Sequence, residues 1–374
     1  MGVMTGTSAG EQSALQRAWK KVLTDFGLPR IIILVTFVLL FVLAGIYAMD
    51  LPSFFGDVLR RWGMWGILAL AMVPSINSGI GPNFGITVGI VGGMLGAVLS
   101  IEMNHAGVFD FIANQDARAV AQVMMAIAIG GAVGTGMGVL YGMLLNQVKG
   151  SEMAITVYIG FSAIAVFNIL WALIPVRTSI MILPATGRGL RQMINLQDDF
   201  GEAFNRIFSF NIGNFTMHTG LLIVFFICCL LMWVFTKSRL GMMMSAAGSN
   251  PSYARASGIN VDRMRILGTA ISTALGAIGI VVYAQSFGFL AMYNAPLWMG
   301  FTAVASVLIG GATVKRARVF DVLLGAFLFN GIITIALPLA NVMIPDVAGV
   351  PEMLRMIITN GIILYALTKV KGGR

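Results

Sequence analysis

The sequence predicts an all-α, polytopic membrane protein with about ten transmembrane helices and with broken or re-entrant segments. Hydrophobic residues make up 58% of the 374 residues and charged residues only 10%, whereas about a quarter of the residues in a soluble domain are charged. The mean hydropathy is +0.89. The apolar stretches suffice for about ten membrane crossings at roughly 20 residues each, so little chain remains for a separate soluble domain.

Residues 1–30 are expected to form a cytoplasmic tail that contains an interfacial helix. Apolar residues recur there at helical spacing with basic residues between them: Leu15, Arg17, Trp19, Lys20, Lys21, Val22, Leu23 and Phe26. An ordinary solvated tail is the alternative. The remainder, 31–374, is expected to be a single transmembrane domain.

Hydropathy predicts the membrane spans in this domain. They fall at about 31–48, 63–79, 84–103, 119–145, 153–174, 216–236, 266–286, 297–312, 319–340 and 352–369. With both termini in the cytoplasm, 16 of the 24 Lys and Arg residues lie inside and 8 outside, as the positive-inside rule requires. Segment 175–215 is then an external loop, which we expect to fold as short helices, and segment 237–265 is a cytoplasmic loop.

Glycine recurs at every fourth position on two of the spans. The two ladders are Gly81, Gly85, Gly89 and Gly93, and Gly130, Gly134, Gly138 and Gly142. Small residues at this spacing let helix backbones approach closely in lipid. Both spans are therefore expected inside the helix bundle. A phosphate-binding loop is excluded, because the glycines are not followed by Gly-Lys-Ser/Thr.

Several kinds of chemistry find no support in the sequence. It contains no Walker A motif and no HExxH, and neither His105 nor His218 has a Cys, Asp or Glu at metal-ligand spacing. The net charge of +9 comes from short basic clusters between apolar segments, which indicates membrane topology and not nucleic-acid binding. We expect no catalytic site, no metal and no cofactor in this chain.

Ionisable side chains are nearly missing from the interiors of the spans. Glu102 and Asp321 lie at span ends. A proton-driven carrier usually needs an ionisable group in mid-membrane, so a transport function would draw its energy from another protein.

Uncharged polar groups do occur within the spans, where they can offer hydrogen bonds to a neutral solute without the desolvation cost of a charge. The stretch 75–84, SINSGIGPNF, combines glycine, proline and asparagine, which predicts broken helix at membrane depth, next to a cavity or buried in protein. Hydrogen bonding between helices is the alternative reading. The candidate pathway residues are Asn77, Ser78, Asn83, Phe84, Asn168, Ser306 and Asn330.

The cytoplasmic loop 237–265 carries the most specific local signal. Ser249 or Asn250 can cap a helix that starts at Pro251, and Gly258 suits the left-handed residue that ends it. The small residues Ala254, Ala256 and Gly258 would let this helix dock in a groove of another protein. A simple connector helix remains the alternative.

At this loop the sequence resembles the permease subunits of ATP-binding-cassette (ABC) importers for simple sugars, within the branched-chain amino acid and ribose permease superfamily. A small residue, Gly, x, Asn, then Ala and Ser-Gly-Ile-Asn is the family pattern, and it stands here at 247–250, Ala254 and 257–260. A second match is the segment 303–312, AVASVLIGGA. The chain departs from the family at 79–84, where an acidic residue is missing, and at 315–318, where basic residues replace a glycine-rich turn.

The resemblance implies a set of partners and a role for the loop. The permease would form a dimer, with a second copy or with a paralogue, in the bacterial inner membrane. Cytoplasmic ATPase subunits would bind ATP and magnesium, and a periplasmic or lipid-anchored protein would deliver the solute. The implied ATPase-coupling residues are Gly248, Ser249, Asn250, Pro251, Ala254, Arg255, Gly258, Ile259 and Asn260.

The sequence therefore favours a non-catalytic transport subunit for a monosaccharide-like solute. A nucleoside or another small polar solute is the nearest alternative. An ion-coupled secondary carrier and a non-transporting scaffold or receptor are alternatives from other classes.

Overall fold

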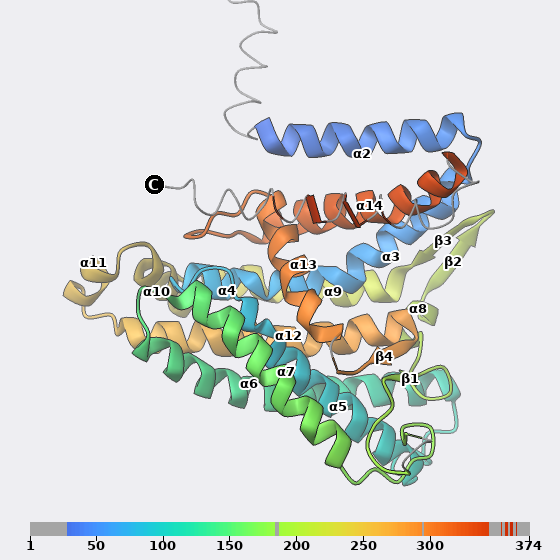
Figure 1. Ribbon diagram of the computed structural model, residues 1–374, viewed down its shortest axis with the longest axis horizontal. Helices are drawn as coiled ribbons and strands as arrows, with labels where there is room; N and C mark the ends of the chain where they lie inside the picture. The colour runs from blue at the N-terminus through green and yellow to red at the C-terminus, as the bar shows by residue number, and fades with distance from the viewer. Residues whose placement is uncertain are drawn as a thin grey trace, which may run out of the picture.

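The computed structural model describes residues 28–183, 187–293 and 295–343, together with Met353, Met356, Ile357, Asn360, Gly361 and Leu364. Most of the described chain is helical (Figure 1). In chain order the helices are α2 (Leu28–Ile46), α3 (Leu51–Leu70), α4 (Met72–Asn77), the 3₁₀ turn η1 (Phe84–Ile86), α5 (Thr87–His105), α6 (Gln115–Gln147), α7 (Glu152–Leu173), α8 (Ala203–Arg206), α9 (Thr219–Lys237), α10 (Arg239–Ser249), α11 (Pro251–Ala256), α12 (Val261–Phe287), α13 (Ala295–Ile309) and α14 (Val319–Met343).

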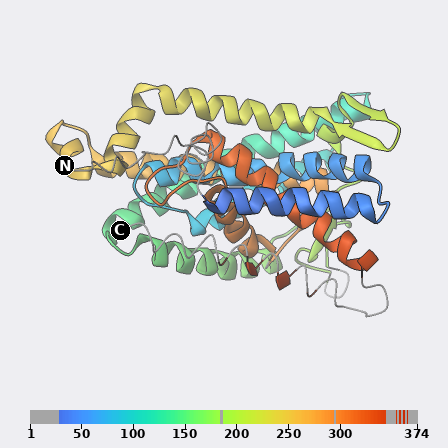
Figure 2. The same ribbon diagram turned by 90° about the horizontal axis from the view of Figure 1, so that it is seen from above.

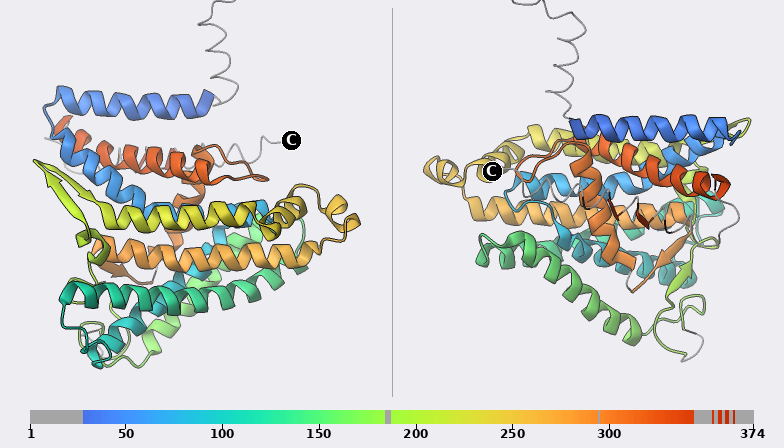
Figure 3. Two further views of the ribbon diagram at one scale, coloured as in Figure 1. Left: turned by 180° about the vertical axis from the view of Figure 1, so that it is seen from behind. Right: turned by 45° about the horizontal axis from the view of Figure 1, so that its top comes forward.

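The axes of α2, α6, α9, α12 and α14 are roughly aligned, whereas α5 and α7 run obliquely to them (Figure 1). Figure 3 shows the helices layered from α2 through α14, then α3 and α9, then α12, to α6. Helix α11 projects from one end of this bundle, and the strands β2 (Ser209–Ile212) and β3 (Phe215–His218) project from the other (Figures 1 and 2). These two ends are called the α11 end and the hairpin end below.

The all-α membrane class is confirmed. Among the described residues, six helices are long and apolar enough to cross a membrane: Phe84–His105, α6, α7, α9, α12 and α14. The apolar stretches Arg30–Ile46 of α2 and Pro296–Ile309 of α13 are shorter. The count of about ten spans is not confirmed, because the predicted span 352–369 lies largely outside the described residues. The tail with its expected interfacial helix also lies largely outside them.

The second predicted span differs from its prediction. Its helix begins at Leu51 and not near residue 63, because Asp50 caps it by accepting a hydrogen bond from the Ser53 N–H at 3.5 Å. The hydropathy window excluded the basic pair at 60–61, yet Arg60 is accommodated within the helix by an ion pair with Asp57 at 3.5 Å.

The external segment 175–215 was expected to fold as short helices, and this is wrong in the main. The described residues of the segment, which are all but 184–186, hold one four-residue helix, α8, and the strands β1 (Met193–Asn195) and β2. Strand β1 pairs antiparallel with β4 (Phe289–Ala291), which places Ile194 opposite Leu290. The partner strand lies almost a hundred residues away in the sequence, so no local pattern could predict this pairing.

Glycine residues on α5 and α6 allow three helices, α5, α6 and α12, to pack closely together. A Cβ atom added to Gly130 of α6 would lie 2.8 Å from the Cα of Gly93 on α5, and one added to Gly142 would lie 2.9 Å from the Cα of Ile266 on α12. One added to Gly92 would lie 2.9 Å from the backbone nitrogen of Gly134. Side chains would therefore force α5, α6 and α12 apart.

The expectation that both glycine spans sit inside the bundle is right for α5 and wrong for α6. The apolar stretch of α5 is 89% buried and that of α6 only 28%. Helix α6 buries its glycine face on α5 and α12, while Leu140 is 68% exposed on the opposite face. A stripe of small residues on one face is therefore enough to pack α6 against α5 and α12, even though its opposite face is exposed.

Gly130→Leu is expected to lower the stability of the fold strongly. The added side chain meets the α5 backbone, which cannot move aside without separating the helices, and such overpacking costs about 1–3 kcal/mol or more. Thermal unfolding of the detergent-solubilised protein, followed by size-exclusion chromatography, measures the loss.

Gly131→Leu is the matched control, because nothing lies within 4 Å of the corresponding position on the exposed face of α6. If the two variants unfold at the same temperature, backbone contact between α5 and α6 does not limit stability.

Candidate coupling and pathway site

The loop between α10 and α12 forms the helix that the sequence predicts. Asn250 caps α11 by accepting a hydrogen bond from the Tyr253 N–H at 3.1 Å, and Pro251 occupies the first turn. Gly258 has a φ of +79°, so it takes the left-handed conformation that ends the helix. Asn260 then caps α12 by accepting from the Arg263 N–H at 3.0 Å. Ser249, the other predicted cap, does not cap α11, because its hydroxyl donates to the carbonyl of Ala246 instead.

The surface of α11 divides into an anchored side and a free side. Ala254 is fully buried against Ala247 and Val261 of its own chain, so the expectation that it faces a partner protein is wrong. Gly258 has open space around it, and Tyr253 is 68% exposed. The sequence analysis did not single out Tyr253, which is the exposed aromatic residue of α11.

Helix α10 touches the chain break that was predicted at 75–84. Helix α4 ends at Asn77 and η1 begins at Phe84, so the break is confirmed. A Cβ atom on Gly79 would lie 2.8 Å from the Cα of Gly248, and one on Gly248 would lie 2.7 Å from the nitrogen of Gly79. Helix α10 and the break are therefore in direct backbone contact.

The break, residues 78–83, is called the α4–α5 turn below. Gly79 and Gly81 have φ values of +84° and +90°, a conformation that side chains disfavour. The Ser75 hydroxyl donates to the carbonyl of Gly81 at 2.8 Å and so closes the turn on the end of α4. The α4–α5 turn therefore has a defined conformation.

Asn77 fastens the end of α4 to the connection between α13 and α14. Its Nδ2 donates to the carbonyl of Ala317 and its Oδ1 accepts from the Ala317 N–H, both at 3.0 Å. Ser78 is buried and donates to the carbonyl of Ser75. In this conformation both side chains form hydrogen bonds with other groups of the protein.

Asn83 joins the turn to two helices of the central group. Its Nδ2 donates to Ser272 Oγ on α12 at 3.0 Å, and its Oδ1 accepts from the Tyr141 hydroxyl on α6 at 2.9 Å. Ser272 lies about 16 Å along α12 from Val261 at 1.5 Å of rise per residue, so the turn reaches well into the bundle. Phe84 follows and packs against Phe301 of α13 at 5.3 Å between ring centroids.

The other candidate pathway residues lie apart from this turn. Ser306 and Asn330 are buried, and each bonds to the carbonyl four residues earlier on its own helix. Asn168 is half-buried on α7. The structure therefore brings together four of the seven candidates: Ser78 and Asn83 in the α4–α5 turn, and Asn77 and Phe84 directly beside it.

Two ion pairs hold the start of α12 against the connection between α6 and α7. Arg265 Nη2 lies 2.6 Å from Glu152 Oε1, and Lys149 Nζ lies 2.7 Å from Asp262 Oδ1. Arg265 is only 8% exposed, so removing Glu152 would leave a buried charge without its partner. Each pair joins residues 113 positions apart in the sequence, so no local pattern predicted the pairing.

At the hairpin end the external segment is docked on α5 and α12 through buried polar groups. Asp199 is 7% exposed, and its Oδ1 accepts from Asn104 Nδ2 at 2.8 Å and lies 3.6 Å from His105 Nδ1. Burial raises the pKa of the Asp199 carboxyl above its usual range. Gln285 Oε1 accepts from the Phe204 N–H at 3.1 Å. The fold thus gives His105 an acidic neighbour that no sequence spacing revealed.

The chain matches a known family over most of its length. Residues 54–367 fit the family model described as "Branched-chain amino acid transport system / permease component". The chain belongs to this family. The resemblance drawn from segments 247–260 and 303–312 is confirmed at this level.

Individual relatives of this permease match over shorter stretches. The nucleoside ABC transporter permease protein NupB of Lactococcus lactis is 30% identical over 159 residues, 42% of this chain and 40% of the relative. The galactofuranose transporter permease protein YtfT of Escherichia coli is 28% identical over 158 residues, 41% and 46% of the two chains. The galactose/methyl galactoside import permease protein MglC of Haemophilus influenzae is 28% identical over 134 residues, 35% and 38%.

Each of these alignments spans less than half of the relative's own length. No solved structure matches this permease.

Asn83→Leu is expected to destabilise the fold by about 1–3 kcal/mol, because it leaves the buried Tyr141 hydroxyl and Ser272 hydroxyl without their partner. Tyr141→Phe removes one bond only, and hydrogen bonds between membrane helices average about 0.6 kcal/mol, so it should cost less. Unfolding of both single variants and of the double variant measures the coupling between the two residues. Additive losses would show that the bond between Asn83 and Tyr141 contributes nothing.

Proposed function

We propose that this chain is the transmembrane permease subunit of an ABC importer, which forms the translocation pathway and takes its energy from separate ATPase subunits. The observation that carries the proposal is the backbone contact between Gly248 and Gly79. Gly248 lies near the end of α10, just before the exposed helix α11, and Gly79 lies in a turn that enters the bundle. A site for outside force and a candidate gate are therefore adjacent.

Force applied to α11 would reach the bundle by two routes. Asn250 caps α11 itself and Asn260, at the end of the loop, caps α12, so a displacement of α11 would be passed on to the start of α12. One route runs through Gly248 to the α4–α5 turn. The other runs through α12 and the pair of Arg265 with Glu152 to α6 and α7.

The α4–α5 turn is the proposed gate. Asn77 and Asn83 bind protein groups in the conformation described here, so a solute would meet their amides only when the turn moves. Such movement would exchange hydrogen bonds within the protein for hydrogen bonds to the solute, which keeps the energy difference between the two states small. Ser306, Asn330 and Asn168 remain candidates for the wall of the pathway on α13, α14 and α7.

The proposed orientation places the α11 end in the cytoplasm of a bacterial cell, with both termini on that side of the inner membrane. The basic residues at 237–265 and 315–318 then lie inside, in accord with the positive-inside rule. The proposed partners are two ATPase subunits that bind ATP and magnesium, a second permease copy or paralogue, and a solute-binding protein at the hairpin end.

A monosaccharide-like solute is the proposed cargo. The candidate gate offers amides and hydroxyls without charge, which suits a neutral solute rich in hydroxyl groups, and the relatives from Escherichia coli and Haemophilus influenzae are named for sugars. A nucleoside is the second candidate, because the relative from Lactococcus lactis is named for nucleosides.

An ion-coupled carrier is the alternative from another class. It would need a charged group or an ion site in mid-membrane. The closest candidates, Asn77 and Asn83, use both ends of their amides to bind the protein. Purified chain in liposomes tests this alternative, because concentrative uptake of ribose, galactose or uridine driven by an ion gradient without ATPase would overturn the ABC proposal.

Tyr253→Ala is expected to weaken binding of the ATPase subunit by about tenfold or more, because exposed tyrosines at the centre of an interface are common binding hot spots. Pull-down of the tagged chain from native membranes, with quantification of the co-purified nucleotide-binding subunit, measures the effect. Thermal stability should stay unchanged, since the side chain is 68% exposed.

Phe111→Ala is the matched control, because Phe111 is an 82% exposed aromatic residue near the hairpin end. Equal retention of the ATPase by the two variants would contradict the assignment of α11 as the docking helix. Absence of any nucleotide-binding subunit from the wild-type pull-down would favour a scaffold or a secondary carrier.

A further inference from the structure

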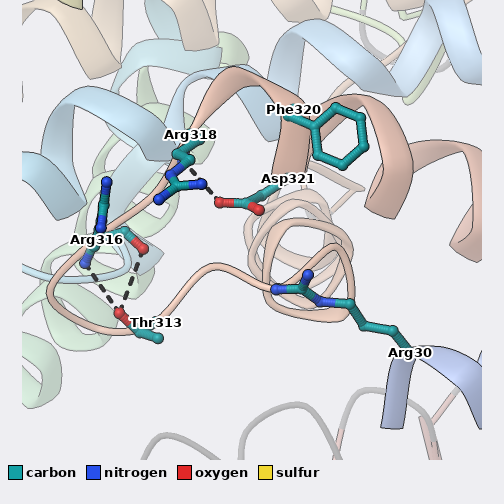
Figure 4. Close-up of a pocket in the computed structure, with 7 residues that line it drawn as sticks. Arg30, Thr313, Arg316, Arg318, Phe320 and Asp321 are labelled. Atoms are coloured by element: carbon teal, nitrogen blue, oxygen red, sulfur yellow. Dashed lines mark hydrogen bonds between the residues drawn. The ribbon is translucent and has the colours of Figure 1, made fainter. Parts of the chain in front are cut away.

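A basic pocket lies at the α11 end, between the start of α2 and the connection from α13 to α14. Its volume is about 360 Å³. The lining residues are Arg30, Gly311, Thr313, Arg316, Arg318, Phe320 and Asp321 (Figure 4). None of them belongs to α11 or to the α4–α5 turn, so the proposed transport function does not account for this pocket.

The connection that forms the pocket is held in a fixed shape. Ala317 is bound on both sides by Asn77, and the Thr313 Oγ1 accepts from the Arg316 N–H at 3.1 Å. Arg316 and Arg318 flank the anchored Ala317. Their backbones are therefore fixed, while their side chains remain exposed.

Arg30 closes the pocket from the side of α2. Its guanidinium lies directly against the backbone of Gly311, where any Cβ atom would overlap it. Gly311 has a φ of +108°, so the position favours glycine both for its conformation and for this contact. Figure 4 shows Arg30 reaching from its helix toward the loop that carries the other two arginines.

The positive charge of the pocket is not neutralised by the described part of the chain. None of the three guanidinium groups forms an ion pair with a carboxylate of the described residues. Asp321 is the one acidic residue in the lining, and its Oδ2 accepts from the Arg318 backbone N–H at 2.9 Å. Three arginines against one carboxylate leave an excess of two positive charges, so the pocket attracts an anion.

Exposed apolar residues lie beside the pocket. Helix α2 exposes a stripe of large apolar residues beyond Arg30, in which Val35 is 58% and Leu39 54% exposed. Phe320, at the rim, is 58% exposed. An anion bound beside such a stripe would be placed as the headgroup of a lipid whose acyl chains lie along the helix.

We propose that this pocket binds the phosphate group of an anionic phospholipid from the adjacent leaflet. The arginines contact the phosphate, since guanidinium groups bind phosphate oxygens in pairs. Helix α2 and Phe320 contact the acyl chains. A bound lipid would bridge α2 to the connection between α13 and α14, which Asn77 ties to the α4–α5 turn.

Native mass spectrometry of the detergent-solubilised full chain tests the proposal, with phosphatidylglycerol and phosphatidylcholine of identical acyl chains as probes. The wild type is expected to retain phosphatidylglycerol preferentially. The double variant Arg316→Gln/Arg318→Gln is expected to lose about tenfold or more of that affinity, because each basic residue near an anionic headgroup contributes measurably to binding. Its thermal stability should be unchanged, since both side chains are exposed.

The double variant Lys237→Gln/Arg239→Gln is the matched control, because it removes the same charge from exposed positions at the same end of the bundle. Equal losses in the two double variants would overturn the site in favour of general charge attraction. Complete displacement of the lipid by millimolar glycerol 3-phosphate would overturn the lipid in favour of a soluble phosphate compound. Loss of ATPase co-purification in Arg316→Gln/Arg318→Gln, with lipid retention intact, would assign the arginines to the partner protein instead.

Discussion

The close approach of α5, α6 and α12 is the constraint on which the rest of the structure depends. Lipid supplies no hydrophobic drive between helices, so their association depends on dense contacts and on hydrogen bonds between them. The glycines at 92, 93, 130 and 142 let backbones meet where any side chain would collide. Asn83 can bridge Tyr141 and Ser272 because the three helices are this near. The position of the α4–α5 turn follows from that bridge.

The same short turn is contacted from three directions. Helix α10 touches it through Gly248, the connection between α13 and α14 is tied to its start through Asn77, and the central helices hold its end through Asn83. Because the hydrogen bond from Ser75 to Gly81 closes the turn on the end of α4, we expect the turn to move as one unit. A displacement of α11, transmitted by capped helices, would therefore change the turn and its three neighbours together. This convergence is the physical basis for proposing that energy from an ATPase opens the pathway here.

The sequence predicted what depends on neighbouring residues and missed what depends on tertiary contact. The cap at Asn250, the left-handed Gly258 and the break after Asn77 were predictable because capping and turn chemistry is local. The burial of Ala254 and the pair of Arg265 with Glu152 were not, since both depend on segments that approach only in the fold. Strand β1 was not predicted for the same reason, since it pairs with the distant strand β4. The hairpin of β2 and β3 did carry a local signal in its Gly213-Asn214 turn, which the helical expectation for 175–215 overlooked.

Hydrogen–deuterium exchange of the chain in the proposed complex with ATPase subunits tests the central claim most directly. Exchange would be compared between the nucleotide-free complex and the complex trapped with ATP and vanadate. We predict that the amides of α10 and α11 and those of the α4–α5 turn change protection together on trapping, while the glycine-packed centre of α5 stays protected. A change confined to 250–260, with the exchange of 78–83 unaltered, would contradict the account.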